Sequence, residues 1–287
     1  MADDPLDLVT VVVVTYHSAH CFDALDALLS HCPQVVVSDN GSNDGSAGLA
    51  RTRWPRATVL EHGRNLGFGA ANNRALARVN TPFAFLLNPD CEVSPDGLRE
   101  LVRAAIAMPD AAVVAPQLCA GPDRPEVNYR WPSTLWTSRG PGADGPACVG
   151  FVVGAALLLR LDRFEGIGYF DERFFLYYED DDLCLRLFQH RRPLVLWPAV
   201  RAVHRSRGSV KGNRPWRSEY LRGYHHAQSK LIYTAKHRSK AQARRQRWSV
   251  LLGTTLALPL RAMAWSPRLL ARMAGRWMGL AQWRFDD

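Results

Sequence analysis

The sequence predicts an α/β protein: a mostly parallel sheet with helices on both faces, followed by a helical, basic C-terminal extension. In the first 120 residues, short runs rich in Val, Leu and Phe alternate with helical stretches. Alternation of this kind is typical of a parallel sheet that is covered by helices on both sides. From residue 216 onward the pattern is helical and basic, without a strand-like run. We therefore predict two domains, at residues 1–215 and 216–287.

Five strands are expected in the first 120 residues, at 8–15, 34–39, 57–62, 83–88 and 111–116. Four helices are expected between them, at 19–30, 46–54, 69–79 and 95–108. The last helix has two start signals, because Ser94 is a favoured N-cap and Pro95 occupies the first helical position. Residues 120–149 are rich in Gly, Pro and Asp, which predicts a long loop or flap. The remaining expected elements are a strand at 150–164, a helix at 179–190 and a strand at 193–204.

Composition and cysteine usage favour a globular protein in a reducing compartment. The chain has 287 residues, of which 47% are hydrophobic, enough for a buried core. Its six cysteines are scattered singly with no C-x-x-C pair, so neither a disulfide framework nor a zinc site is indicated. Residues 1–8 carry three acids and no base, unlike a secretory signal, and the apolar run at 9–16 has the length of a buried strand. We expect a cytoplasmic protein.

The net charge of +9 is unevenly distributed along the chain. Residues 201–287 hold 19 Lys and Arg against three acids, a balance of +16. Residues 1–200 hold 17 basic and 24 acidic residues, a balance of −7. A basic tail of this kind indicates an anionic partner surface, either a membrane or a nucleic acid.

Within this tail the apolar pattern favours a membrane surface. The uncharged run 248–260 is thirteen residues long, shorter than the about 20 that cross a bilayer. Beyond it, Arg268, Arg272 and Arg276 recur every four residues among Leu, Met and Trp, as in helices that lie in the membrane interface. Nucleic acid is disfavoured because it would not require so many apolar side chains. Two alternatives stay open: the tail packs on the rest of the chain, or on a second copy in a homodimer.

Polar residues follow the first two predicted strands where they end. Thr15 and Tyr16 end the first strand, and the run 38–46, SDNGSNDGS, ends the second. Ligands bind beyond the carboxyl ends of the strands in such sheets, so this edge is the expected binding site. Asp39 has the chemistry to accept a hydrogen bond from a pyrimidine N–H, and Tyr16 to pack on that base. The alternative is that this run only makes a turn and caps a helix.

Two further motifs are expected on the same edge. The run 67–72, GFGAAN, is a partial dinucleotide-binding pattern, and its glycines also suit a diphosphate at a helix start. Asp90, just past a buried strand, offers the oxygen ligands that Mg²⁺ or Mn²⁺ prefers. Asn88, two residues earlier, points to the same side of an extended chain. The alternative for Asp90 is a solvated turn residue.

Four adjacent acids, Glu179 to Asp182, open the predicted helix 179–190. The helix dipole favours acids in a first turn and explains one or two of them. Asp180 lies three, four and seven positions before apolar residues of one helix face, so it is predicted to point inward, with a raised pKa, as a general base. Glu179 and Asp182 share an adjoining face. His204 ends a strand and is a candidate metal ligand.

As an ordered set, these motifs resemble an inverting family 2 glycosyltransferase with the GT-A fold, most closely its rhamnosyltransferase branch. The resemblance covers about residues 8–210. It is carried by the runs 11–18, 38–46, 65–76, 86–93, 150–160 and 170–187 and by the His204 segment. It implies that residues 1–215 are the catalytic domain and that residues 216–287 are a membrane-associating extension.

The resemblance implies a role for each matching position. Tyr16 and Asp39 match the residues that hold the nucleotide base. Asp90 matches the last acid of the D-x-D metal motif, His204 matches a metal ligand, and Asp180 matches the catalytic base. The other residues expected at the site, with the donor or beside the base, are Thr15, Asn65, Asn72, Asn88, Glu179 and Asp182.

Two positions depart from the family pattern. The first position of the D-x-D motif is Asn88, which implies that the metal, Mg²⁺ or Mn²⁺, is held more weakly or by fewer protein ligands. The third position of the E-D-x-D motif, usually apolar, is Asp181, which we expect to face solvent or the acceptor.

The resemblance implies one displacement that inverts the sugar. Asp180 takes the proton of an acceptor hydroxyl, which attacks the anomeric carbon of a nucleoside-diphosphate sugar. The expected donor is dTDP-L-rhamnose, with a UDP-sugar as the alternative. The expected acceptor is a glycan, linked to polyprenyl diphosphate, in cell-wall or surface polysaccharide synthesis. The expected place is the inner face of the cell membrane, where the enzyme is bound peripherally.

Two rival functions predict other outcomes. A nucleotidyltransferase also uses a metal on this kind of sheet, but it releases diphosphate rather than a nucleoside diphosphate. A nucleic-acid-binding or membrane-tethering protein that kept the fold without the chemistry would not need Asp180, Asp90 and His204 together.

Overall fold

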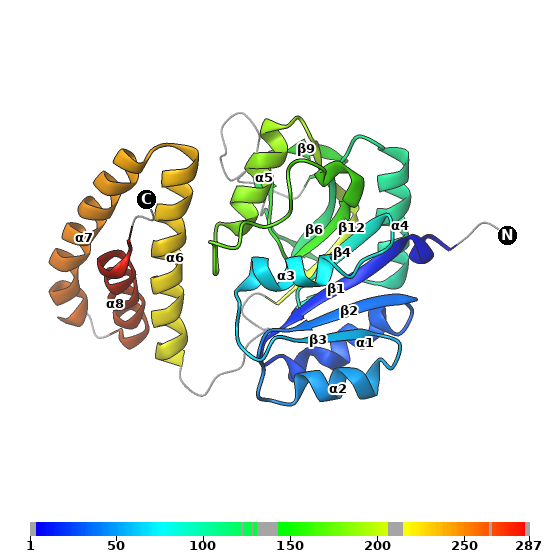
Figure 1. Cartoon of the computed structure of the whole chain (residues 1–287), viewed down its shortest axis with the longest axis horizontal. Coiled ribbons are helices and arrows are strands. Elements are labelled where there is room, and N and C mark those ends of the chain that lie inside the picture. Colours follow the sequence, from blue (N-terminus) through cyan, green and yellow to red (C-terminus); the bar gives the residue numbers. More distant parts are fainter. Residues whose placement is uncertain are drawn as a thin grey trace. The chain divides into compact units, whose positions relative to one another are not determined.

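The computed structural model of the chain describes residues 4–121, 123–127, 129–130, 143–205, 215–263 and 266–284, with side chains except at residues 215 and 260–263. The chain forms two compact units (Figure 1). The first, the sheet unit, comprises residues 1–170 and 180–211, and the second, the helical unit, comprises residues 171–179 and 212–287. The short segment 171–179 thus groups with the C-terminal helices, although it precedes the last strand in sequence.

The sheet unit is built on a ten-stranded mixed sheet. Its strands are β1 (Val9–Thr15), β2 (Gln34–Asp39), β3 (Thr58–Glu61), β4 (Phe83–Leu87), β5 (Cys91–Glu92), β6 (Val113–Gly121), β7 (Arg124–Pro125), β9 (Ala147–Val149), β11 (Ala156–Arg160) and β12 (Leu194–His204). A separate two-stranded sheet pairs β8 (Tyr129–Arg130) with β10 (Phe151–Val152).

The sheet has a parallel half and a mixed half. The strand order is β3-β2-β1-β4-β11-β6-β12-β5, and β1, β2, β3 and β4 pair in parallel, as the alternating sequence predicts. β11 then runs antiparallel between β4 and β6, because the chain turns back after β6. The parallel half brings the carboxyl ends of β1, β2 and β4 to one edge, where the expected binding residues follow.

Helices cover both faces of this sheet, as the sequence predicts. They are α1 (Phe22–Leu29), α2 (Ser46–Arg53), α3 (Phe68–Leu76), α4 (Pro95–Ala107) and α5 (Glu179–Gln189), with short 3₁₀ turns η1 (Pro5–Leu8), η2 (Ala19–Cys21) and η3 (Leu161–Phe164). Successive side chains of a strand point to opposite faces. Accordingly Val11 and Val13 pack in the core under α1, α2 and α4, whereas Val12 packs in the core under α3 and α5.

Most predicted elements form within a residue or two of their expected bounds, the usual uncertainty at element ends. The predicted N-cap of α4 is confirmed, because Ser94 Oγ accepts a hydrogen bond of 3.0 Å from the backbone N–H of Gly97. The prediction of one strand over 150–164 was wrong. A turn at Gly154 divides it into β10 and β11, and Gly154 then contacts α5 instead of a neighbouring strand.

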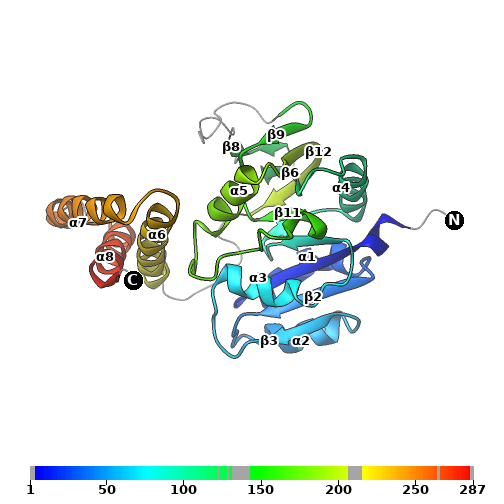
Figure 2. The same ribbon diagram turned by 45° about the horizontal axis from the view of Figure 1, so that its top comes forward.

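The helical unit contains three long helices, α6 (Pro215–His237), α7 (Lys240–Met263) and α8 (Pro267–Gln282), which lie side by side (Figure 2). α6 and α8 cross at glycines. A Cβ on Gly275 would lie 1.9 Å from the carbonyl oxygen of Tyr220, and one on Gly223 would lie 2.0 Å from that of Arg272. Any larger residue at these positions would push the two backbones apart. Among the described residues, no helix has the length and apolar content needed to cross a lipid bilayer.

Candidate active site

The first part of the site is formed where β1 and β2 end. Thr15 Oγ1 donates a hydrogen bond of 2.9 Å to Oδ1 of Asp39, and Oδ2 of Asp39 accepts one of 3.0 Å from the backbone N–H of Ser42. Both Thr15 and Asp39 are buried. The half-buried Tyr16 follows, with its ring centroid 4.2 Å from that of His17. Thr15 therefore fixes the carboxylate of Asp39 at the end of β1, and Tyr16 is the next residue in the chain.

A second part is the loop that leads into α3, and buried Asn40 holds it. Asn40 Nδ2 donates to Oδ1 of Asn65 at 2.9 Å, while Asn40 Oδ1 accepts from the backbone N–H of Leu66 at 2.8 Å. Asn65 Oδ1 also accepts from the N–H of Gly67, at 2.9 Å. Asn65 therefore shapes the start of α3. Asn40 belongs to the run 38–46, which had a simple turn as its alternative interpretation, and its place directly after the second strand is the one signal that could have identified it.

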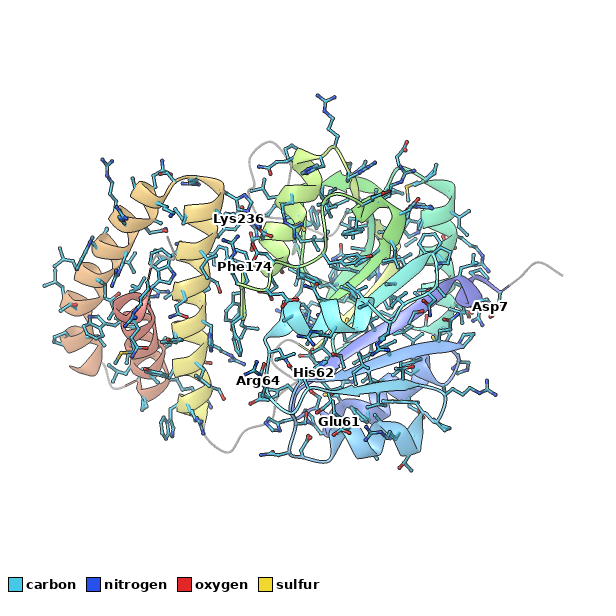
Figure 3. The ribbon with its side chains drawn as sticks, viewed as in Figure 1. Asp7, Glu61, His62, Arg64, Phe174 and Lys236 are labelled. Atoms are coloured by element: carbon cyan, nitrogen blue, oxygen red, sulfur yellow. The ribbon has the colours of Figure 1, made fainter. Side chains whose placement is uncertain are left out.

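The same loop lies against the turn after β2. A Cβ on Gly41 would lie 2.6 Å from the backbone of Arg64, so this approach requires glycine. Arg64 and the half-buried His62 follow β3 on this loop (Figure 3). Asn72, expected at the donor site, is buried inside α3, where its Nδ2 donates to the carbonyl of Phe68 at 2.9 Å.

A third part pairs the expected metal ligands. β12 pairs antiparallel with β5, with His204 opposite Cys91. This register brings His204 Nε2 to 3.6 Å from Oδ1 of the buried Asp90. Asn88 opens the tight turn before β5, because its carbonyl accepts from the backbone N–H of Cys91 at 3.0 Å. Within the described ranges, no three His, Cys, Asp or Glu side chains gather as a cation site.

The fourth part is Asp180, in the first turn of α5. Its Oδ2 accepts from the backbone N–H of Gly154 at 3.3 Å, and its Oδ1 accepts from the N–H of Asp181 at 2.9 Å. Burial, and then the neighbouring carboxylate of Asp181, raise the pKa of Asp180 to about 6. A Cβ on Gly154 would lie 3.6 Å from Asp180 Cβ and 3.7 Å from the Phe68 ring. Gly154 therefore lies between the carboxylate and the start of α3, and Asp180 points inward as predicted.

The neighbouring acid Asp181 does not face open solvent. Its Oδ1 lies 2.6 Å from Nη1 of Arg130, and the side chain is 18% exposed. The Arg130 guanidinium in turn lies 3.6 Å from the centroid of the Phe151 ring. The expectation that Asp181 faces open solvent was therefore wrong, and its alternative, that Asp181 faces the acceptor, stays a prediction. Arg130 lies in the flap, far from α5 in sequence, so no local pattern shows the pair.

The other two acids of the run are buried. Asp182 is fully buried, and its Oδ2 accepts from Nε of Arg186 at 2.8 Å. Arg186 Nη1 also donates to the carbonyl oxygens of Ile167 and Gly168, at 2.9 and 3.0 Å. Asp182 thus orients Arg186, which attaches α5 to the preceding loop. Glu179 groups with the helical unit rather than with Asp180.

The mixed sheet of this strand order, covered by helices on both faces, has the GT-A fold of glycosyltransferases. The chain belongs to glycosyl transferase family 2, whose family model matches residues 10–162. That span begins in β1 and ends just after β11.

Named relatives extend over most of the chain. It is 29% identical over 281 residues to N-acetylglucosaminyl-diphospho-decaprenol L-rhamnosyltransferase of Mycobacterium tuberculosis. The alignment covers 85% of this chain and 89% of the relative. It is 26% identical over 213 residues to the low-salt glycan biosynthesis hexosyltransferase Agl10 of Haloferax volcanii, covering 69% and 67% of the two chains.

Among solved structures, the fold is similar to that of the mannosyltransferase PcManGT from Pyrobaculum calidifontis, determined with GDP-Man and Mn²⁺. The TM-score is 0.56 at 16% identity, over 96% of this chain and 86% of that one. At this identity the likeness concerns the fold. Family and fold together make this protein a glycosyltransferase.

Proposed function

We propose that this enzyme transfers a sugar, with inversion, from a nucleoside diphosphate to an acceptor hydroxyl, and that Asp180 is the base. The observation that carries the proposal is the carboxylate of Asp180, half-buried at the start of α5 with its pKa raised to about 6. Asp180 takes the hydroxyl proton as the acceptor oxygen bonds to the anomeric carbon. The bond from that carbon to the diphosphate oxygen breaks, and its electron pair leaves with the nucleoside diphosphate.

The donor is proposed to lie along the edge formed by β1, β2 and the start of α3. Asp39 and Tyr16 would hold the base, since Asp39 is fixed by Thr15 and Ser42 in an orientation that leaves lone pairs for a further donor. The backbone N–H groups at the start of α3 suit the diphosphate, because a helix N-terminus attracts anions. The donor site would be supported by the residues around it that do not contact the base: Asn65, Asn72 and the turn at Asn88.

A divalent metal ion, Mg²⁺ or Mn²⁺, is proposed at Asp90 and His204. Carboxylate oxygen and imidazole nitrogen both suit Mn²⁺, and carboxylate oxygen suits Mg²⁺, so the donor chemistry of the pair fits such an ion. Two protein ligands leave coordination positions for diphosphate oxygens and water. When bound, the ion would neutralise charge on the diphosphate leaving group.

The proposed sugar is L-rhamnose from dTDP-L-rhamnose, and the proposed acceptor is a glycan on polyprenyl diphosphate, in cell-wall or surface polysaccharide synthesis. The mycobacterial relative supports both choices through its name, an L-rhamnosyltransferase for N-acetylglucosaminyl-diphospho-decaprenol. The second candidate, a UDP-sugar donor, uses the same pyrimidine edge. We further propose that the enzyme works in the cytoplasm, bound peripherally to the membrane that holds such an acceptor.

A donor screen tests this proposal. Purified protein is incubated with dTDP- and UDP-sugars, Mg²⁺ or Mn²⁺, and a short synthetic lipid-diphosphate glycan, and the released product is identified by mass spectrometry. Release of a nucleoside diphosphate with sugar transferred to the acceptor is expected. Release of inorganic diphosphate would instead show a nucleotidyltransferase, and the anomeric configuration of the product, read by NMR, must be opposite to that of the donor.

A further inference from the structure

Three apolar side chains are exposed in a row along α7. Trp248, Leu252 and Leu256 recur every four residues, so they line one side of the helix. They are 65%, 64% and 66% exposed. Of the residues that α7 buries in the core of the helical unit, Ala243 is on the opposite side of the helix, whereas Leu251, three residues after Trp248, borders the row. The row itself is exposed, and a contiguous exposed apolar patch marks an interaction surface.

Basic residues precede this row on the same helix. Lys240, Arg244 and Arg245 are all exposed in the N-terminal part of α7, and the helix contains no acidic residue. A partner must therefore accept apolar side chains and also carry negative charge. An anionic lipid surface has both properties, because its acyl region accepts Trp and Leu while its headgroups attract Lys and Arg.

α8 fits this role less well, although its arginines recur every four residues. Gly275 and Gly279 are buried against α6, and Arg272 lies 4.0 Å from Glu219 of α6. A second copy of the chain also fits poorly on α7, because the helix has no acid to pair with the incoming cations. Charge complementarity thus selects a bilayer rather than a dimer as the occupant.

We propose that this side of α7 docks on an anionic bilayer, with the apolar row inserted and the three basic residues, called here the basic end, at the headgroups. The inference rests on the proposed function in one respect, since a lipid-linked acceptor would lie in the same bilayer. Vesicle binding needs neither donor nor acceptor. The docking proposal can therefore fail while the proposed transferase function stands, and the proposed function can fail while the docking proposal stands.

The test is flotation of the full chain with vesicles of phosphatidylglycerol and phosphatidylcholine at low salt. Replacing the apolar row by serine is expected to weaken partitioning at least about tenfold. Replacing the basic end by glutamine is expected to weaken it about 100-fold on anionic vesicles, and to have no effect on vesicles of pure phosphatidylcholine. The matched control is Ile106→Ser, which removes a side chain of α4 that is 50% exposed. Deleting residues 240–287 is a poorer test, because it also removes the packing of α8 on α6.

Three results would overturn the docking surface. One is a parent protein that does not float with anionic vesicles, and a second is a serine variant that floats as well as the parent. The third is a dimer, seen by light scattering against the chain mass of 32.1 kDa, that the serine substitutions dissociate while vesicle binding persists. That outcome would assign the row to a second copy of the chain.

A different observation concerns the segment 171–179 of the helical unit, which leads into α5. Asp171 Oδ2 lies 2.7 Å from Nζ of Lys236 on α6, and this ion pair, with the Arg173 guanidinium, holds the pKa of Asp171 far below its usual range against the opposing effect of burial. The Lys236 ammonium also lies 5.9 Å from the ring centroid of the buried Phe174 (Figure 3). The start of the segment is thus attached to the last turns of α6.

Earlier turns of α6 hold the rest of the segment. Ser229 Oγ donates a hydrogen bond of 2.9 Å to the carbonyl of Leu176. The ring of Phe175 stacks on His225, with centroids 4.3 Å apart. Since Ser229 and His225 are four residues apart, they share a helix face, and this face follows the segment along its length.

The segment ends in a strained turn. Tyr177 and Tyr178 both adopt positive φ, 70° and 66°, a region that bulky L-residues rarely enter. Such strain persists only where the surroundings hold it, and it concentrates at functional sites. The two tyrosines contact His226 of α6 through their rings, and the next residues in the chain are Glu179 and Asp180.

We infer that α6 fixes the conformation of segment 171–179, the stretch of chain that leads into Asp180, with Lys236 as a positioning residue for the proposed transfer. Lys236→Met is expected to lower kcat about tenfold, leave the donor KM unchanged and speed amide hydrogen exchange in residues 171–179. Lys236→Arg, which keeps the charge, is expected to restore kcat. Lys230→Met is the matched control, because Lys230 is exposed on the same helix.

Hydrogen exchange separates this inference from the proposed function. Faster exchange in Lys236→Met with unchanged kcat would show that α6 holds the segment without positioning the base. Unchanged exchange, or an equal loss in Lys230→Met, would remove the role of Lys236 altogether. If instead the Asp180→Asn variant remains active, the proposed base is wrong while the exchange result still stands.

Discussion

The backbone N–H of Gly154 donates a hydrogen bond to Oδ2 of Asp180, across 26 residues of sequence. This contact joins the turn before β11 to the first turn of α5, and it holds the carboxylate while leaving it ionisable. With a pKa of about 6, the group is ionised at neutral pH yet basic enough to take a proton as the acceptor attacks.

The pH dependence of transfer follows from this pKa. Only ionised Asp180 accepts a proton, so kcat/KM for the acceptor is expected to fall as pH drops through about 6, by about tenfold per unit below it. The check is a rate profile from pH 4.5 to 8.5 with saturating donor. A profile that stays flat down to pH 5 would mean that another group is the base.

The ion pair between Arg130 and Asp181 should tune this profile. The Asp181 carboxylate raises the pKa of Asp180 and the Arg130 guanidinium lowers it. Asp181→Asn is therefore expected to move the acid limb of the profile to lower pH, and Arg130→Gln to move it to higher pH. Arg103→Gln, on the exposed side of α4, serves as the control and should leave the limb in place. Shifts in the same direction for both variants would contradict the assignment.

Metal dependence gives a prediction for the Asp90-His204 pair. Chelation with EDTA is expected to abolish transfer, and excess Mg²⁺ or Mn²⁺ to restore it. Asp90→Ala is expected to weaken donor binding measured by calorimetry in the presence of metal, because the ion would contact both the carboxylate and the diphosphate. His204→Ala should act in the same direction.

Full activity in excess EDTA would refute this site. So would an Asp90→Ala variant whose donor affinity, with and without added metal, equals that of the parent. The donor affinity of each variant without metal is the internal control. A variant that has lost only the metal site keeps this affinity, whereas a variant that has lost its fold does not.

The sequence predicted the parallel half of the sheet because buried valine runs alternate there with helices of ordinary length. Asp180 could be predicted to point inward because its apolar partners are on the same helix. Asp181 could not be placed, since its partner Arg130 lies in the flap and an ion pair of that range leaves no periodic signal. The division of residues 150–164 into two strands could not be predicted either, because an apolar run does not show where strand pairing ends.

Contacts between segments that are distant in sequence could not be predicted either. The attachment of segment 171–179 to α6 joins residues far apart in sequence, and no sequence pattern shows that glycines of α6 and α8 are the places where the two helices cross. By contrast, His204 was identified from its place at a strand end, and the antiparallel register of β12 on β5 brings it to Asp90.

The crossing of α6 and α8 predicts an opposite response at two helical glycines. Gly275→Ala places a Cβ against the carbonyl of Tyr220 and is expected to destabilise the helical unit by about 1–3 kcal/mol. Gly253→Ala on α7, where no atom lies within 4 Å of the new Cβ, is expected to stabilise it by up to about 1 kcal/mol. Thermal unfolding followed by circular dichroism checks both. Equal melting temperatures for the two variants would show that α6 and α8 do not pack in this way.

If Asp180 is the base, Asp180→Asn must lose transfer activity while it stays folded. Folding raises the pKa of Asp180 above 3.8, so ionisation disfavours the folded state, a cost of up to about 3 kcal/mol that is absent below pH 3.8 and complete above about pH 6. Asparagine removes this cost but loses one hydrogen-bond acceptor, so stability at pH 7.5 should stay within about 1 kcal/mol or rise.

The measurement is the turnover number for sugar transfer by Asp180→Asn at pH 7.5, with donor affinity from calorimetry and with Asp110→Asn, an exposed acid, as control. We expect turnover to fall by ~10²–10⁴ while donor affinity and melting temperature are kept. Turnover within about threefold of the parent, in a folded variant that binds the donor, would contradict this expectation.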